Sequence, residues 1–364
     1  MAETLISPGT LARENDQSQI TSNPITAGAA VVGPTVKGRV GIPTLVTSWT
    51  EYQATFGADF ASGSDSYTFL TSISAYNYFQ NGGTTLLVTR VASGSFTPAT
   101  SSFVSGSSAG IVASGSAFIL ETLSPGTIMN SISTETSGAL ASGSKDNLRW
   151  EITNPDTSRG VFSLLIRQGN DTPNLKSVLE TWTNLSLDPK ASNYISKVIG
   201  DQTFTLVGSG TATPYLQVTG SYPNASRYVR VKTVGLKTPD YLNNLGNPAS
   251  NLYTASIPVA ASGTFGGATG DIVVSSQNFY ENINNTNTQG LVGANYTDTF
   301  NLLANKDDYQ FNVVTTPGLI YANATHATQL NTLITNIQSR GDAIIVLDLQ
   351  NYGASVAKIG RAHV

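Results

Sequence analysis

Alternating apolar and polar positions near the start of the chain predict a compact unit of strand, helix, helix and strand. A short apolar run at Ala29–Val32 indicates a buried strand, which ends at Gly33 and Pro34. A helix should follow Ser48, because Ser48 and Glu51 have the spacing of a capping box. The apolar face of this helix and its terminating glycine are supplied by Trp49, Tyr52, Phe56 and Gly57.

A second helix and a second strand complete this unit. We expect the helix to follow Ser64 and Asp65 and to end at Asn81–Gly83. Thr84–Val91 is rich in β-forming residues and predicts the strand. The helical apolar spacing is that of Phe69, Leu70, Ile73 and Tyr76.

The middle of the chain has a different pattern. Residues 92–116 form a low-complexity Ser/Gly/Ala stretch, which we expect to be flexible or loosely ordered. From there to about residue 299 the pattern is mostly β, with one helix expected around Pro189–Ile199. The predicted strands are residues 117–122, 148–153, 162–167, 203–207, 228–234 and 271–275.

The last part of the chain predicts one βαβ unit. Phe311–Thr315 reads as a buried strand followed by Pro317 and Gly318, and a helix over 325–339 should end at Gly341. A mostly apolar strand over 343–349 follows. Such runs are typical of parallel strands covered on both faces.

These patterns predict an α+β fold whose α/β core is split in sequence. We expect an extended N-terminal arm over residues 1–25 and the first part of the core over 26–95. A β-rich insertion of one or more domains should occupy 96–300, and the βαβ start of the C-terminal core should occupy 301–358.

Composition narrows the function classes. Charged residues make up 12% of the 364 residues, against about 25% in ordinary proteins. This depletion favours surfaces that contact other proteins.

The net charge of −4 gives no support for nucleic-acid binding, and the absence of cysteine excludes disulfides and thiolate metal sites. We see neither a signal peptide nor a bilayer-spanning apolar run, and we expect synthesis in a host cytoplasm, no membrane insertion and no cofactor.

Six segments, taken in order, carry a family resemblance. They read SPGTLARENDQSQI, AAVVGPTVKGRVGIPTLVTSWTEYQATFG, YNYFQNGGTTLLVTRV, SPGTIMNS, VLETWTNLSLDPKASNYISKVIGD and DDYQFNVVTTPGL. Together they resemble the contractile phage tail sheath protein family of the myovirus type. Residues 92–116 and much of 205–300 match poorly, and the resemblance implies that these parts belong to outward-facing insertions.

The resemblance implies a structural role rather than an enzymatic one. Sheath subunits form a helical sleeve around a tail tube, and the sleeve contracts to drive the tube through the host envelope, so that the viral genome is ejected. The implied partners are other copies of the chain, the tail tube protein, and the baseplate and tail terminator proteins. The implied location is the virion tail.

The N-terminal arm is the predicted intersubunit site. A polar, extended segment tethered to a compact core suits β-strand addition to a neighbouring sheet edge. The residues assigned to it are Ser7, Pro8, Gly9, Arg13, Glu14 and Asp16.

The end of the chain departs from the family pattern, because sheath proteins continue into a further C-terminal domain. We expect the chain to be C-terminally truncated and residues 359–364, IGRAHV, to be a non-native tail that resembles a translated sequencing adapter. The 364-residue chain alone should then form no sheath-like tubes.

Other candidate residues have weaker patterns. His326 reads as a lone surface histidine, and no His or Cys cluster suggests a metal site. Ser108 matches a G-x-S-x-G nucleophile elbow by letters, although it lies in a Ser/Gly run. Asp348 lies near the C-terminal end of a predicted parallel strand, where ligand sites gather, but a helix cap or a loop carboxylate is the simpler interpretation. A basic cluster is formed by Arg227, Arg230 and Lys232 around Tyr228, and either an acidic neighbour, nucleic acid or plain solvent would suit it.

Three rival functions stay open at this stage. The first is a sheath in another contractile injection system, such as a pyocin-like particle or a secretion system. The second is a β-rich adhesin or surface-layer protein, for which we find no export route. The third is an α/β hydrolase that uses Ser108.

Overall fold

The computed structural model describes residues 24–62, 65–129, 144–272 and 282–353. The structure contains both helices and strands, and the strands form several sheets. The predicted α+β class is therefore confirmed. Residues 1–23 of the predicted N-terminal arm and the predicted non-native tail lie outside the described residues. The predicted end of the arm at residue 25 is wrong, because Ile25 is the first residue of strand β1. Most of the strand predicted at 271–275 lies outside them as well.

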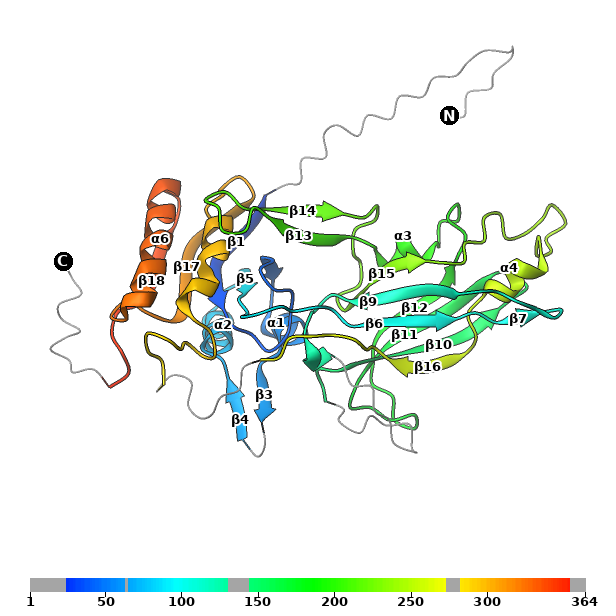
Figure 1. Ribbon diagram of the computed structural model, residues 1–364, viewed down its shortest axis with the longest axis horizontal. Coiled ribbons are helices and arrows are strands. Elements are labelled where there is room, and N and C mark those ends of the chain that lie inside the picture. Colours follow the sequence, from blue (N-terminus) through cyan, green and yellow to red (C-terminus); the bar gives the residue numbers. More distant parts are fainter. Residues whose placement is uncertain (1–23, 63–64, 130–143, 273–281, 354–364) are drawn as a thin grey trace, which may run out of the picture.

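A five-stranded sheet brings together the two ends of the described chain (Figure 1). Its strand order is β18-β17-β1-β5-β2. β1 lies between β17 and β5 and is parallel to both, and β18 is parallel to β17, whereas β2 is antiparallel to β5. The bounds are Ile25–Gly33 for β1, Thr44–Val46 for β2, Leu86–Arg90 for β5, Tyr309–Ile320 for β17 and Ile344–Asp348 for β18.

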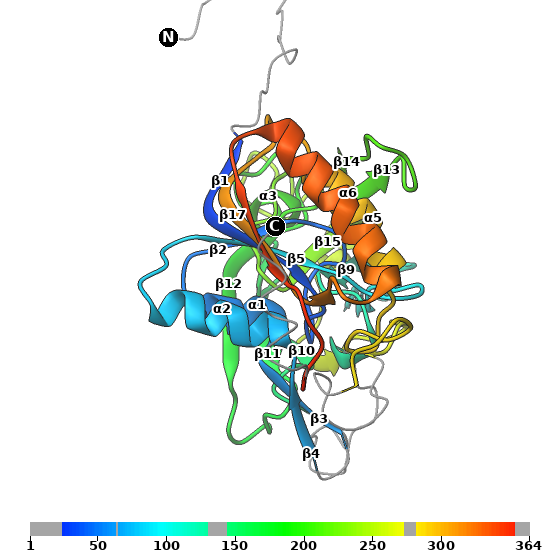
Figure 2. The same ribbon diagram turned by 90° about the vertical axis from the view of Figure 1, so that its left-hand side faces the viewer.

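Helices cover both faces of this core sheet, because β1 and β5 are apolar on both sides. Figure 2 shows α1 and α2 on one side of the sheet and α5 and α6 on the other. Tyr52 and Phe56 of α1 pack with Val31 and Val88, while Phe300 of α5 and Leu330 of α6 form a second cluster. The bounds are Trp49–Phe56 for α1, Leu70–Gln80 for α2, Gly293–Tyr296 for the 3-10 turn η2, Thr297–Leu302 for α5 and Ala324–Arg340 for α6.

The α1 helix begins and ends where the sequence predicts. The Ser48 hydroxyl accepts a hydrogen bond from the Glu51 backbone N–H at 3.1 Å, and the Glu51 carboxylate accepts one from the Thr47 N–H at 2.8 Å. Gly57 follows with φ 71°, a region that favours glycine. Gly341 ends α6 in the left-handed conformation that the sequence also predicts.

The predicted start of α2 is wrong. Asp65 lies in a hairpin strand, β4, that pairs with β3, and the helix begins at Leu70. The hairpin carries Phe60 onto Phe69, with ring centroids 5.2 Å apart. This aromatic contact explains why the chain stays extended through residue 68. The bounds are Asp59–Ser62 for β3 and Asp65–Thr68 for β4.

A second, larger body lies between β5 and η2 in sequence and extends away from the core sheet (Figure 1). A four-stranded sheet, β12-β11-β10-β16, and a three-stranded sheet, β15-β9-β6, form most of it. Two hairpins, β7-β8 and β13-β14, and short helices complete it. The strand bounds are Thr100–Val104 (β6), Ser107–Ser108 (β7), Ile111–Val112 (β8), Ser116–Thr122 (β9), Leu148–Asp156 (β10), Val161–Gln168 (β11), Val178–Ser186 (β12), Thr203–Val207 (β13), Tyr215–Thr219 (β14), Val229–Val234 (β15) and Ala261–Thr264 (β16); the helix bounds are Thr127–Met129 (η1), Ile195–Ile199 (α3) and Asn251–Ser256 (α4).

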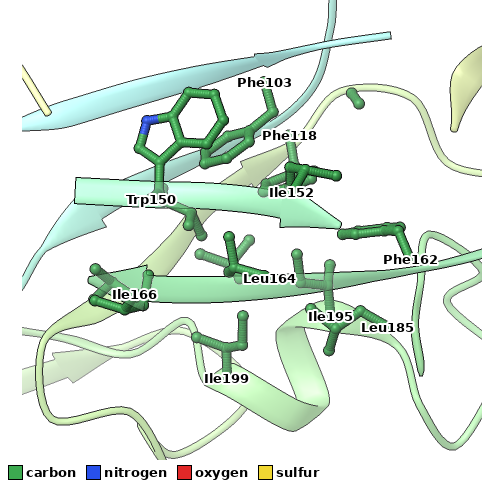
Figure 3. Close-up of a cluster of buried hydrophobic side chains, with 14 of the residues drawn as sticks. Phe103, Phe118, Trp150, Ile152, Phe162, Leu164, Ile166, Leu185, Ile195 and Ile199 are labelled. Carbon is green, nitrogen blue, oxygen red and sulfur yellow. The ribbon is translucent and has the colours of Figure 1, made fainter. Parts of the chain in front are cut away.

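One apolar cluster holds this inserted body together (Figure 3). Phe118 stacks on Phe103 at 4.2 Å between ring centroids and on Phe162 at 5.5 Å, so it joins the two sheets. Ile195 and Ile199 of α3 pack against the same cluster. Each large apolar side chain buried here contributes about 1.5–3 kcal/mol, and the body therefore has a core of its own.

Two further predictions for the body are wrong. Residues 92–116 contain strands β6, β7 and β8 rather than a loosely ordered stretch, because Ala99 and Phe103 are buried and β6 pairs with β9. The helix expected around Pro189–Ile199 is limited to Ile195–Ile199, since the residues before it form a turn in which Asp188 accepts a hydrogen bond from the Lys190 N–H.

The boundary between core and body is crossed by two kinds of contact. The buried pair Lys37–Asp146, 3.1 Å apart, joins the core to the body. Leu206 and Leu216 of the β13–β14 hairpin pack against the core cluster that contains Phe300. The domain boundaries set out from the sequence stay a prediction.

Candidate assembly site at the core sheet

The residues assigned to the intersubunit arm, Ser7, Pro8, Gly9, Arg13, Glu14 and Asp16, lie outside the described residues. The structure does describe where the arm joins the fold. The Ile25 N–H donates to the Asp308 carbonyl at 2.9 Å, and Ile25 pairs with Tyr309. The arm is therefore attached to β1, a central strand of the core sheet.

Among the described strands, β18 is one edge of the core sheet and leaves part of its surface uncovered. Ile345 and Leu347 pack against the core cluster, but Ile344 and Val346 point away from it and are 69% and 54% exposed. The prediction that this strand is covered on both faces is wrong, because the cluster that α1 and α2 cover is formed by β1, β2, β5 and Val313 of β17 and contains no residue of β18. An edge strand of this kind has free backbone groups that another chain can pair with.

The other edge of the sheet is less suited to pairing. β2 has three residues, Thr44–Val46, and follows directly after Pro43. A short edge strand flanked by proline offers few backbone donors to a neighbour. Of the two edges, β18 is the better candidate for strand addition.

His326 is buried, so its interpretation as a surface histidine is wrong. Its Nδ1 accepts a hydrogen bond from the Ile320 N–H at 3.2 Å, and its side chain lies beneath the end of β17. Burial lowers the pKa of His326, because the charged imidazolium is disfavoured there. The neutral ring has a structural role in which it fixes the start of α6 against β17.

Ser108 lacks the surroundings of a nucleophile elbow. It lies in a two-residue strand, β7, and is followed by a tight turn at Ala109 and Gly110 rather than by a helix. The chain then returns as β8, with Ser108 paired to Ile111. The sharp strand-to-helix turn that exposes a catalytic serine is not formed here.

Asp348 is the last residue of β18, so its interpretation as a helix cap or loop carboxylate is wrong. Its Oδ2 accepts a hydrogen bond from the Gly318 N–H at 3.3 Å, and its backbone carbonyl accepts one from Tyr321 at 2.8 Å. β17 continues through Pro317 and Gly318 to Ile320, beyond the predicted strand. Asp348 thus stabilises the irregular end of β17.

The basic cluster is paired with carboxylates of its own chain. Arg230 contacts Glu121 at 2.5 and 3.0 Å, and Lys232 contacts the other Glu121 oxygen at 2.9 Å. Arg227 lies 3.5 Å from Glu51. These pairs disfavour a role as a phosphate-binding patch.

Sequence reasoning missed a buried ionic network in the inserted body. Asp171 accepts from Arg167 at 2.7 and 2.9 Å and from Arg149 at 3.2 Å, and the side chains of all three are at most 4% exposed. Glu151 pairs with Arg167 at 2.9 Å. Arg149 and Arg167 alternate with the residues of β10 and β11 that form the apolar cluster, so the sequence pattern places them on the opposite face and gives no sign that they are buried.

Within the described residues, no group of His, Cys, Asp and Glu has the arrangement of a metal site. None of the described helices is both long enough and apolar enough to span a bilayer.

Comparisons with known proteins give a fold-level likeness. No protein family model matches the chain, and no curated protein matches it. A sheath tail protein from Listeria innocua is similar over 87% of this chain and 46% of its own length, with 11% identity and a TM-score of 0.41. A sheath tail protein from Desulfitobacterium hafniense is similar over 93% of this chain and 52% of its own length, with 12% identity and a TM-score of 0.37. The chain thus spans about half the length of each, and likeness at these values carries no functional argument.

Proposed function

We propose that this chain is a structural subunit of a contractile tail sheath, located in the tail of a bacteriophage virion. Its copies polymerise into a helical sleeve around the tail tube protein. The sleeve contracts on a signal from the baseplate and drives the tube through the host envelope.

One observation carries the proposal. Six segments that resemble the tail sheath family occur in the family's order, and the second and the sixth contribute the neighbouring parallel strands β1 and β17. Thr26 and Gln310, which pair in this sheet, are 284 positions apart in sequence. A sheet closed over such a separation is consistent with a core that tolerates a large insertion.

The surface of the described chain suits assembly. Among the described strands the β18 edge, with Ile344 and Val346 exposed, offers backbone groups and apolar area to a further strand, which another copy or chain beyond residue 364 can supply. Backbone pairing is compatible with movement of whole subunits, because it does not depend on particular side chains. In this proposal the free energy of contraction lies in contacts between copies, so no nucleotide-binding site is needed.

The locus that encodes the chain tests the proposal. The complete reading frame should stand beside a gene for a tail tube protein, with capsid and terminase genes nearby. A tube gene without capsid or terminase genes would instead assign the chain to another contractile injection system. A locus that lacks any tube gene would refute the sheath assignment.

A further inference from the structure

A cavity of about 210 Å³ lies where the core meets the inserted body. At about 30 Å³ per water molecule, it has room for a side chain or a small ligand. It opens between the loop after β1, the end of β9, and strands β13 and β15. The residues that matter for binding are Arg39, Ile42, Phe96, Glu121, Phe204 and Arg230.

The cations around this cavity outnumber the carboxylates that pair with them. Glu121 already binds two of them, Arg230 at 2.5 Å and Lys232 at 2.9 Å. Arg39 makes no hydrogen bond or ion pair with any residue that the structure describes. Its guanidinium lies over the Phe204 ring, 5.2 Å from the centroid.

Among the described residues Arg39 is consequently a charge without a counterion. Burial, and then the charge of Arg230, lower the pKa of Arg39 below its ordinary value. A partly buried cation of this kind is stabilised by any carboxylate that reaches it. Asp201 is two residues before β13, which forms one wall of the cavity. Its carboxylate accepts hydrogen bonds from the backbone N–H groups of Ser221 and Tyr222.

We propose that this cavity binds the carboxylate side chain of an acidic peptide segment, with Arg39 as its main partner. A guanidinium binds a carboxylate through two parallel hydrogen bonds, and Arg39 is free to do so. Ile42, Phe96 and Phe204 provide apolar walls for the methylene groups of a glutamate or aspartate. Phosphate fits less well, because a dianion would lie close to the Glu121 carboxylate. This inference goes beyond the proposed function and does not depend on it.

Calorimetric titration of the full chain tests the inference. The probe is acetyl-Gly-Glu-Gly-amide, and the matched probes are acetyl-Gly-Gln-Gly-amide and inorganic phosphate. Because acidic residues of this chain, such as Glu14 and Asp16, are a second source of carboxylates, the titration is repeated on the chain carrying Glu14→Gln and Asp16→Asn.

The glutamate probe should bind at least one of these two chains about tenfold or more tightly than the glutamine probe does. Binding by both chains alike points to a carboxylate from another protein, and binding by the substituted chain alone shows that the chain's own segment fills the cavity. Arg39→Gln should abolish the preference for glutamate, whereas Arg39→Lys, which retains the charge without the planar fork, should weaken it. Unfolding midpoints of both variants verify that they fold.

Three results would overturn the inference: equal binding of the glutamate and glutamine probes, a preference that survives Arg39→Gln, or no binding by either chain. Phosphate binding that requires Arg39, without glutamate binding, would replace the carboxylate with a different ligand and so overturn it too.

Discussion

Removing the charge of Asp171 should destabilise the inserted body strongly. The Asp171 side chain is fully buried and accepts hydrogen bonds from Arg167 at 2.7 and 2.9 Å, from Arg149 at 3.2 Å and from the Ser177 N–H at 3.1 Å. Asp171→Asn retains the shape of the side chain but removes the carboxylate that the two buried guanidinium groups share. Breaking a buried ion pair on one side costs about 3–5 kcal/mol.

This expected loss of stability is large relative to the free energy of unfolding of a whole domain, which is about 5–15 kcal/mol. Urea unfolding monitored by tryptophan fluorescence measures it, since Trp150 and Trp182 both lie in the sheet that contains this network. Asp240→Asn is the matched control, because Asp240 pairs with Lys190 at the exposed surface. If the two variants unfold at the same urea concentration, the network does not stabilise the body as we reason.

Three further predictions concern the core. Because the pKa of His326 is lowered in the fold, its contribution to stability is fully present above the unfolded pKa of about 6.5 and is lost as the pH falls toward the folded value. The urea midpoint should therefore drop between pH 7.5 and 5.5, and His326→Asn should flatten that part of the curve of midpoint against pH. An unchanged slope in the variant would contradict this prediction. Gln289→Ala should lower the free energy of unfolding by about 1–3 kcal/mol and speed amide hydrogen exchange at Leu70. The reason is that the Gln289 side chain accepts a hydrogen bond from the Leu70 N–H at 2.7 Å and donates one to the Pro317 carbonyl at 3.2 Å. Equal exchange rates at Leu70 in the two proteins would argue against this. Ser48→Ala should lower the free energy of unfolding, measured by heat or urea, by about 1 kcal/mol. Ser48→Asp should lower it less, since aspartate retains a side-chain acceptor for the helix cap. Equal losses of stability in the two variants would show that the cap is not the cause.

The elements that the sequence predicts well are those fixed by neighbours a few positions away. Ser48 and Glu51 cap α1 through contacts three or four residues apart, and Gly341 ends α6 through its own backbone conformation. Local patterns also place five of the eleven described strands of the inserted body, namely β9, β10, β11, β13 and β15. In β10 and β11 the alternation of residues reveals a buried face.

The errors arise where distant parts of the chain decide the structure. The Ser-rich stretch contains strand β6 because Phe103 packs against the rings of Phe118 and Trp150, which belong to later strands of the inserted body. The burial of His326 is a more local case, because β17 runs on to Ile320, six positions away, and the Ile320 N–H donates to the His326 ring. Composition alone contains neither contact.

The candidate sites show the same division. A basic cluster is visible in the letters, but its pairing with Glu121 depends on β15 lying beside β9. The same arrangement leaves Arg39 without an ion pair among the described residues, since the nearby Glu121 carboxylate binds Arg230 and Lys232. Charge balance at a surface is thus a property of the fold and is not predicted from the sequence.

Electron cryomicroscopy of the complete gene product, expressed together with the tube gene from the same locus, tests the assembly role most directly. We expect a helical sleeve around a narrower tube, with neighbouring copies in contact at the core sheet and the inserted body facing outward. Monomers beside bare tubes, under conditions in which both proteins are folded, would contradict it.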